Sequence, residues 1–211
     1  MHAPYGICVE FQPASGAYDE DVRRRFGGGY LLHVGSCIPR KNTEFLLQIH
    51  AALKKRNPLA RLVQVGGTWS TEEQEVIHRE RLEASVHQLR GVSRDELAAI
   101  YRQAAVVLLP SKAEGFGLPV IEALACGAQV IASDLPVLKE VGGDVVIYRQ
   151  VGDLAGWCEA IAEEAGKPRN TFSVAARADR AAQFSWAEHA RIIATRYLEL
   201  ERQAADRSRS W

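Results

Sequence analysis

Two carboxylates, Glu114 and Glu122, carry the clearest chemical signal in this chain of 211 residues, and they flank a glycine-containing segment, GFGLP. Gly115 and Gly117 have no side chains, so a ligand can lie close to the backbone there. Ionised carboxylates accept hydrogen bonds but do not donate them, which makes hydroxyl groups good partners and phosphate a poor one. We therefore expect the two carboxylates to face hydroxyl groups.

The sequence around this segment predicts a strand, a loop and a helix. The apolar, uncharged run at 105–109 is typical of a strand buried on both faces of a parallel sheet. Pro119 suits the first turn of a helix and Gly127 suits its end. A helix that starts at the carboxyl end of a parallel strand points its free N–H groups and positive dipole end at the ligand space. The expected ligand then carries a phosphate or diphosphate close to hydroxyl groups. A nucleotide sugar has both.

Both features have simpler interpretations. Glycine and proline follow strands in many α/β proteins, and Glu122 lies away from the helix face of Ile121, Leu124 and Ala125, where solvent would surround it. The wording of the segment favours the nucleotide-sugar interpretation. Residues 114–127 read EGFGLPVIEALACG, which resembles the E-x7-E motif of retaining glycosyltransferases of the GT-B fold, family 4 in particular. The resemblance extends from about residue 30 to about residue 200.

A basic pair, Arg40 and Lys41, lies in the loop predicted to follow the first strand. Lysine there can reach a phosphate and arginine can add a forked contact, although a solvated basic pair is the alternative. The segment GSCIPRKN at 35–42 resembles the family pattern whose lysine binds the donor diphosphate. Ser36 stands where many members carry a second diphosphate-binding arginine, so that contact is in doubt and Arg40 is the candidate to replace it.

The resemblance also implies a role for each residue of the site. Glu114 lies beside the transferred sugar and is the catalytic candidate, while Glu122 accepts hydrogen bonds from the ribose. The segment RGVS at 90–93 resembles the part that lies against the nucleotide base, with a plain turn as the alternative. The implied donor-binding residues are Ser36, Arg40, Lys41, Val92, Gly115, Phe116, Gly117, Leu118 and Glu122. Phe184 and Trp186, in a segment that resembles the family's F-S-W, are interpreted as packing residues.

Composition narrows the class of partner. Hydrophobic residues make up 47% and charged residues 25%, and 26 basic residues balance 26 acidic ones. This is ordinary for a globular protein and does not favour nucleic acid as a partner. No apolar run approaches the length of a transmembrane helix, and the amino terminus lacks signal-peptide features. We expect a cytoplasmic protein, at the membrane surface in the full enzyme as an alternative, with four free cysteines and neither a metal nor a cofactor.

The fold prediction follows from alternating strands and helices. Strands are predicted at 30–35, 62–65, 86–89, 105–109, 129–132 and 144–148. Helices are predicted at 19–26, from an Asn42 cap to 57, at 71–84, 93–103, 118–126, 135–141, 154–165, 170–183 and 186–202. This order favours an α/β doubly wound parallel sheet, a single Rossmann-like domain that is one half of a GT-B fold. We expect a linker-like stub and short helix at 1–29, a nucleotide-sugar-binding domain at 30–185, and a carboxyl-terminal helix with a frayed tail at 186–211.

The resemblance implies a function for the whole chain. It implies the donor-binding domain of a retaining glycosyltransferase that transfers a hexose from a GDP- or UDP-hexose. The residues PRKN at 39–42 resemble those of family members with mannose-type donors more than those of members with other donors. GT-B enzymes place the acceptor pocket mainly on an amino-terminal domain, so we expect this chain to bind donor but transfer sugar poorly without that domain or subunit. The alternatives are a non-catalytic nucleotide-sugar-binding module, a subunit of a split enzyme, or a GT-B sugar-nucleotide epimerase.

Overall fold

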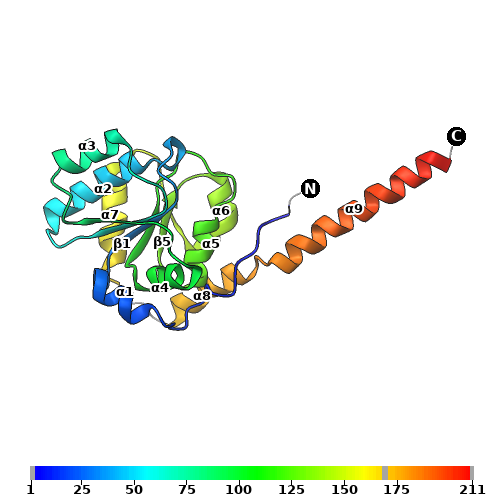
Figure 1. The fold of residues 1–211 in the computed structure, drawn as a ribbon, viewed down its shortest axis with the longest axis horizontal. Coiled ribbons are helices and arrows are strands. Elements are labelled where there is room, and N and C mark those ends of the chain that lie inside the picture. The colour runs from blue at the N-terminus through cyan, green and yellow to red at the C-terminus, as the bar shows by residue number, and fades with distance from the viewer. Residues whose placement is uncertain (1–2, 168–170, 210–211) are drawn as a thin grey trace.

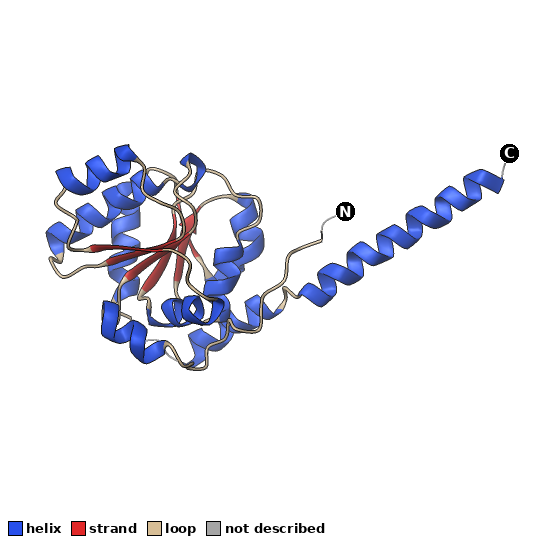
Figure 2. Ribbon diagram, viewed as in Figure 1, coloured by secondary structure: helices blue, strands red, loops and turns tan. Residues whose placement is uncertain are grey.

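A single parallel sheet forms the centre of the molecule (Figures 1 and 2). The computed structural model describes residues 3–167 and 171–209. Residues 1–2 of the predicted linker, the predicted helix start at 170 and the last two residues of the predicted tail lie outside this description. Within it, six strands pair in the order β3-β2-β1-β4-β5-β6. The predicted fold class is confirmed.

The element bounds are as follows. The strands are β1 (Leu31–Val34), β2 (Leu62–Val65), β3 (Val86–Leu89), β4 (Val106–Leu109), β5 (Val130–Ser133) and β6 (Ile147–Arg149). The helices are α1 (Asp19–Phe26), α2 (Thr43–Arg56), α3 (Thr71–Arg79), α4 (Arg94–Gln103), α5 (Leu118–Ala125), α6 (Pro136–Gly142), α7 (Leu154–Ala165), α8 (Thr171–Ala182) and α9 (Trp186–Arg209). Two short 3-10 helices span Pro39–Lys41 and Gly143–Val145.

Helices cover both faces of the sheet. The apolar cluster on one face joins β-strand residues to α2, α3 and α7, and the cluster on the other face joins them to α1, α4, α5 and α6. All four residues of β4 are buried because each face of this central strand carries a helical layer. This explains why the strand reads as a continuous apolar run in the sequence.

The strand order reverses between β1 and β4. The chain moves from β1 outward through β2 to β3, and then returns to continue from β4 through β5 to β6 on the other side. β1 and β4 pair in parallel, with Leu31 opposite Val106. The loops that leave their carboxyl ends turn away to opposite sides of the sheet, and open α/β folds bind ligands at such a switch point. The predicted site loops are the two loops that follow β1 and β4.

Three predicted element bounds are wrong. The helix predicted at 71–84 ends at Arg79, because Arg81 adopts a left-handed φ of 53° and the next residue, Leu82, is fully buried. The strand predicted at 144–148 begins later, because Gly143, with φ 56°, starts a 3-10 turn. The last helix continues to Arg209 instead of ending near Arg202.

The amino-terminal segment lies against the junction of α8 and α9 (Figure 1). The Ile7 amide donates to the Phe184 carbonyl at 3.1 Å. Phe184 is buried, as its packing role requires, whereas Trp186 is 44% exposed although its ring centroid lies 5.8 Å from that of Tyr5. From there α9 extends away from the body of the domain (Figure 1). None of the described helices combines the length and apolarity needed to cross a membrane.

Four cysteines lie in the described chain without forming a disulfide. They are therefore free thiols, as predicted.

A mostly buried ion pair joins α1 to α4. Arg102 donates to both carboxylate oxygens of Asp19, with a shortest contact of 2.6 Å, and the side chains are 7% and 11% exposed. Burial would raise the pKa of Asp19, but hydrogen bonds from Arg102, the Gly16 amide and Gln103 outweigh it and lower that pKa. The pair therefore stabilises the fold above the ordinary carboxyl pKa, and this contribution is lost as the pH falls through the lowered value.

We predict that Asp19→Asn lowers the free energy of unfolding by about 3 kcal/mol at pH 7, because Arg102 is left buried without its counter-charge. The variant should also lose part of the acid-induced decrease in stability below about pH 4. Urea unfolding at several pH values measures both effects. The matched control is Asp21→Asn, which breaks an exposed pair with Arg24 and should cost less than about 1 kcal/mol. Equal losses in the two variants would contradict the prediction.

Candidate functional site

The loop after β1 is fastened to the loop after β4. The Lys112 amide donates to the Arg40 carbonyl at 2.8 Å, and the Asn42 side-chain amide donates to the Pro110 carbonyl at 3.0 Å. Asn42 occupies the N-cap position of α2 as predicted, but its side chain does not cap the helix and its φ is 57°. The expected capping interaction is wrong because that side chain satisfies a carbonyl in the neighbouring loop. The two site loops therefore form one structural unit.

Glu114 is the centre of this unit. Its Oε1 accepts hydrogen bonds from Lys41 Nζ at 2.6 Å and Ser111 Oγ at 2.7 Å, and its Oε2 accepts one from Arg40 Nη1 at 3.0 Å. The Glu114 side chain is 4% exposed and that of Lys41 is 9% exposed, whereas Arg40 is 48% exposed. Two cations against one carboxylate leave a local excess of positive charge. The structure thus brings three of the predicted site residues into direct contact.

Sequence reasoning did not identify Ser111 as a partner of Glu114. The available signal was proximity, because the hydroxyl and the carboxylate belong to residues only three positions apart. The direction of Arg40, which the sequence left open, is settled by its contact with Glu114. Ser36 lies exposed in the same loop, at a point where Gly67 from the loop after β2 approaches closely.

The two glycines of the segment have different structural roles. Gly117 is the N-cap of α5 with φ 101°, and a Cβ on it would lie 2.8 Å from Leu138 Cδ2. A Cβ on Gly115 would meet nothing within 4 Å. Gly117 is therefore required by the backbone, while Gly115 leaves open space in front of the loop. Leu118 opens α5 and is 36% exposed.

Phe116 points away from this open space. It is 8% exposed, and its ring centroid lies 5.2 Å from that of Tyr5 and 5.8 Å from that of Phe184. Its side chain therefore anchors the loop to the apolar core and the amino-terminal segment. A role in ligand binding is left to its backbone amide.

Glu122 is held inside the domain by a tyrosine. Tyr101 is fully buried on α4, and its hydroxyl donates to Glu122 Oε2 at 2.9 Å. Burial raises the pKa of Glu122, and the hydrogen bond from Tyr101 and the charge of Arg94 partly oppose that rise. The alternative that Glu122 is simply solvated is wrong. Tyr101 was missed in the sequence, where a tyrosine on an apolar helix face was the available signal because a buried hydroxyl needs a partner.

Val92 lies apart from the Glu114 cluster. It is half-buried in the loop after β3 and packs against the apolar core. Open α/β sheets bind ligands in the crevice outside the carboxyl ends of their strands. β3 is separated from β1 by β2, so the loop after β3 lies at the far end of that edge from the loops after β1 and β4. The structure does not bring Val92 into contact with the ion-paired residues.

A buried glutamine fixes the glycine loops at the ends of β1 and β2. Gln64 Nε2 donates to the carbonyls of Gly35, at 2.7 Å, and Gly66, and Gln64 Oε1 accepts from Gln88 at 2.9 Å. Gln64 was also missed, although a glutamine within an otherwise apolar strand is a recognisable signal because buried amides must be hydrogen-bonded. Its bonds hold the two loops at the edge of the crevice.

His33 lies buried on β1 beside Gly35 and Lys41. Burial, with a contribution from the charge of Lys41, lowers the pKa of His33 to about 3. The imidazole is therefore neutral at physiological pH. The positive charge of the site comes from Lys41 and Arg40.

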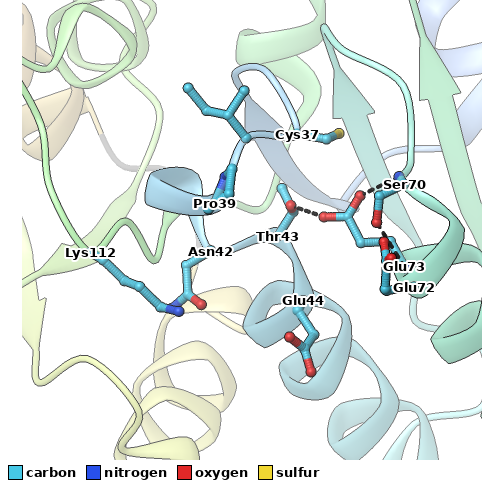
Figure 3. A pocket seen from close by; sticks show the side chains of 10 residues that line it. Cys37, Pro39, Asn42, Thr43, Glu44, Ser70, Glu72, Glu73 and Lys112 are labelled. Atoms are coloured by element: carbon cyan, nitrogen blue, oxygen red, sulfur yellow. Dashed lines mark hydrogen bonds between the residues drawn. The ribbon is translucent and has the colours of Figure 1, made fainter.

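A hollow of about 300 Å³ lies beside the cluster, between the starts of α2 and α3 (Figure 3). Glu73 faces it and accepts hydrogen bonds from the Thr43 hydroxyl and the Ser70 amide. Burial, together with the charge of Glu73, raises the pKa of Cys37 in its wall to about 11. The described lining residues include three carboxylates and one lysine, namely Glu44, Glu72, Glu73 and Lys112. This acidic hollow does not suit a diphosphate, so an anion fits better on the Lys41 side of the loop.

The six-stranded parallel sheet with helices on both faces is a Rossmann-like domain, the kind of domain found in glycosyltransferases of the GT-B fold. Residues 19–152 match the family described as glycosyl transferases group 1, and this match covers more than half of the chain. The chain therefore belongs to the group 1 glycosyl transferases.

Similar proteins include several bacterial glycosyltransferases. O-antigen chain mannosyltransferase B of Escherichia coli is 32% identical over 129 residues, which cover 60% of this chain and 34% of that protein. D-inositol 3-phosphate glycosyltransferase of Corynebacterium jeikeium is 31% identical over 218 residues, which cover 93% of this chain and 51% of that protein. The chain thus spans about one third to one half of the length of these relatives.

Solved structures show the same fold. Sucrose-phosphate synthase from Thermosynechococcus elongatus superimposes with a TM-score of 0.79 at 25% identity, covering 95% of this chain and 52% of that one. HepE from Anabaena, in complex with UDP and glucose, gives a TM-score of 0.76 at 20% identity, covering 90% and 55%.

We predict that Gly117→Ala destabilises the protein by about 2 kcal/mol, because the new Cβ adds left-handed strain and a clash with Leu138. Gly115→Ala is the matched control, since its Cβ would enter open space, and its unfolding free energy should stay within about 0.5 kcal/mol of the wild type. Chemical denaturation of the three proteins provides the comparison. A neutral Gly117→Ala variant would show that the loop backbone relaxes without cost.

Proposed function

We propose that this chain binds the nucleoside-diphosphate sugar donor of a retaining hexosyl transfer of the family 4 type. The observation that carries the proposal is the convergence of Lys41, Arg40 and the amino-terminal end of α5 around Glu114. These groups come from two loops at the switch point of the sheet, where open α/β folds bind ligands. Their chemistry suits a diphosphate that is joined to a sugar.

The diphosphate is proposed to lie against Lys41, Arg40 and the backbone amides of residues 115–118. Lysine and arginine form charge-assisted hydrogen bonds to phosphate, and the dipole of α5 adds a positive end. Fixed donors of this kind stabilise the negative charge that develops on a leaving diphosphate. The proposal needs neither a metal nor a cofactor, and Arg40 takes the place of the arginine absent at Ser36.

The two glutamates are proposed to bind hydroxyl groups at opposite ends of the donor. Glu114 orients the hydroxyls of the transferred sugar, and Glu122 accepts hydrogen bonds from the ribose. Val92 lies against the base. Its half-buried position at the far end of the crevice from Glu114 supports an extended donor that reaches from the loop after β4 to the loop after β3.

The names of similar proteins support the class of donor that we propose. Those compared include a mannosyltransferase and an inositol-phosphate glycosyltransferase, and the similar fold of HepE was solved with UDP and glucose. We propose a GDP- or UDP-hexose, bound in the cytoplasm, and transfer that also requires an amino-terminal acceptor-binding domain or subunit.

The test is thermal unfolding against a panel that contains UDP, GDP, UDP-glucose and GDP-mannose. A ligand at about one hundred times its dissociation constant stabilises by about 2.7 kcal/mol, which raises the midpoint by several degrees in a protein of this size. We predict that the nucleotides of one base, either uracil or guanine, raise the unfolding midpoint of the wild type in this way. The same nucleotides should not raise the midpoint of Lys41→Met or Glu122→Ala. Each variant is compared with its own midpoint without nucleotide, because both substitutions also alter buried contacts.

Lys55→Met is the matched control for this panel. Lys55 is an exposed lysine near the far end of α2, so its removal should leave the ligand-induced shift unchanged. Lack of a shift with every nucleotide, or an equal loss in Lys55→Met and Lys41→Met, would count against the proposed donor site.

We further predict that Glu114→Gln tightens UDP or GDP binding by about three- to tenfold, since the neutral amide no longer competes with the diphosphate for Lys41 and Arg40. The corresponding nucleoside, which lacks phosphate, should bind equally to both proteins. Isothermal titration calorimetry measures these affinities.

Glu44→Gln serves as the control for removing one negative charge nearby. Glu44 is exposed at the start of α2 and lines the acidic hollow, so its loss should change the diphosphate affinity by less than about twofold. Weaker diphosphate binding in Glu114→Gln would mean that the carboxylate does not compete for these cations.

A further inference from the structure

The contact between Tyr101 and Glu122 joins two neighbouring helices, α4 and α5. Tyr101 comes from the last turn of α4 and Glu122 from the middle of α5. The hydroxyl-to-carboxylate distance is 2.9 Å, and the tyrosine is fully buried. One carboxylate oxygen of Glu122 is thus engaged by the protein, which leaves the other oxygen for an outside donor such as a ribose hydroxyl.

The ring of Tyr101 packs against a second aromatic ring. The ring centroid of Phe11, in the amino-terminal segment, lies 6.0 Å from that of Tyr101 in an edge-to-face arrangement. Phe11 is 7% exposed and belongs to the same apolar cluster. A fully buried ring packed in this way has little freedom to rotate, so its hydroxyl offers a fixed donor.

Groups on two helices influence the protonation of Glu122 and of its partner Tyr101. On α4, the Tyr101 hydroxyl and the Arg94 guanidinium both favour the ionised carboxylate, while burial opposes it. Cys126, the residue that follows α5, is buried and makes a small contribution that raises the pKa of Tyr101. Burial, followed by the charge of Glu122, raises the pKa of Tyr101 well above its usual value, so the hydroxyl keeps its proton and remains a donor.

We propose that Tyr101 is a positioning residue that orients the Glu122 carboxylate toward the ribose of the donor. This inference rests on the proposed function of Glu122. It assigns to a residue outside both site loops the task of fixing one carboxylate oxygen, so that the second oxygen is presented to the ligand. It also links the nucleoside end of the site to α4 and, through Phe11, to the amino-terminal segment.

The test compares Tyr101→Phe with the wild type by calorimetry, using UDP and GDP in parallel and a dideoxy analogue of each that lacks the ribose hydroxyls. Tyr101→Phe should weaken binding of the natural nucleotide by about five- to tenfold, which is the net contribution of one ordinary hydrogen bond. The dideoxy analogue should bind equally to both proteins. In a Glu122→Gln background, Tyr101→Phe should have less than a twofold effect, because the two residues act as one unit.

Tyr30→Phe is the matched control. Tyr30 is also buried, and its hydroxyl donates to the Ile100 carbonyl on the same helix, α4, at 2.7 Å. Removing this hydroxyl should lower the thermal midpoint without changing nucleotide affinity. A similar loss of affinity in Tyr30→Phe and Tyr101→Phe would reduce the effect to general destabilisation and overturn the proposal.

The pH dependence gives a readout that a structural role would not produce. Binding through Glu122 requires the ionised carboxylate, so affinity falls as the pH drops through its pKa. Loss of the Tyr101 hydroxyl removes a group that lowers this pKa, and the fall in affinity should move to higher pH in Tyr101→Phe. An unchanged pH profile would contradict the proposal.

A measurement without nucleotide separates this inference from the proposed function. NMR titration of the Glu122 side-chain carboxyl carbon should show a higher pKa in Tyr101→Phe than in the wild type and no change in Tyr30→Phe. If Glu122→Gln leaves nucleotide binding intact, the proposed role of Glu122 fails. If Glu122→Gln weakens binding while Tyr101→Phe alters neither affinity nor titration, the positioning role alone fails.

Discussion

The cost of burying the Glu114 carboxylate is the constraint on which the site depends. A carboxylate with 4% exposure must be compensated by charge and hydrogen bonds, and these come from Lys41, Arg40 and Ser111. Lys41 and Glu114 belong to loops that leave neighbouring strands in opposite directions, so the ion pair also fixes how closely those loops approach. The distance between the two loops therefore depends on the balance of charge between Glu114 and the two cations Lys41 and Arg40.

Backbone features make that approach possible. Gly117 and Asn42 adopt left-handed conformations at the starts of α5 and α2, and the Asn42 side chain bridges the two loops. Gln64 holds the neighbouring loop ends with its amide group. These contacts are neutral, and those of Asn42 with Pro110 and of Gln64 with Gly35 join segments that are distant in the sequence. They surround the charged cluster of Glu114, Lys41 and Arg40 with uncharged hydrogen bonds.

The sequence predicted the sheet well because its strands are buried and apolar, and Leu108 and its neighbours have no other plausible environment. It pointed to the two loops that carry Lys41, Glu114 and Gly117 through their residue types and through the resemblance of these segments to a family motif. It did not predict the Asn42 bridge, the role of Tyr101 or the end of α3 at Arg79. The first two depend on partners distant in sequence, Pro110 and Glu122, and the third depends on the burial of Leu82 in the core; local patterns contain no information about such tertiary contacts.

The packing of Phe116 has a consequence for the order of folding. Its ring contacts Tyr5 near the start of the chain and Phe184 near the end of the domain. Both contacts join residues that are far apart in the sequence. We expect such contacts to form late in folding, because a long stretch of chain must first be closed into a loop. During synthesis the loop that carries Glu114 cannot reach its final packing until Phe184 has left the ribosome. The loop that carries Glu114 is therefore packed in place after the sheet beneath it, when nearly all of the chain up to Phe184 has been made.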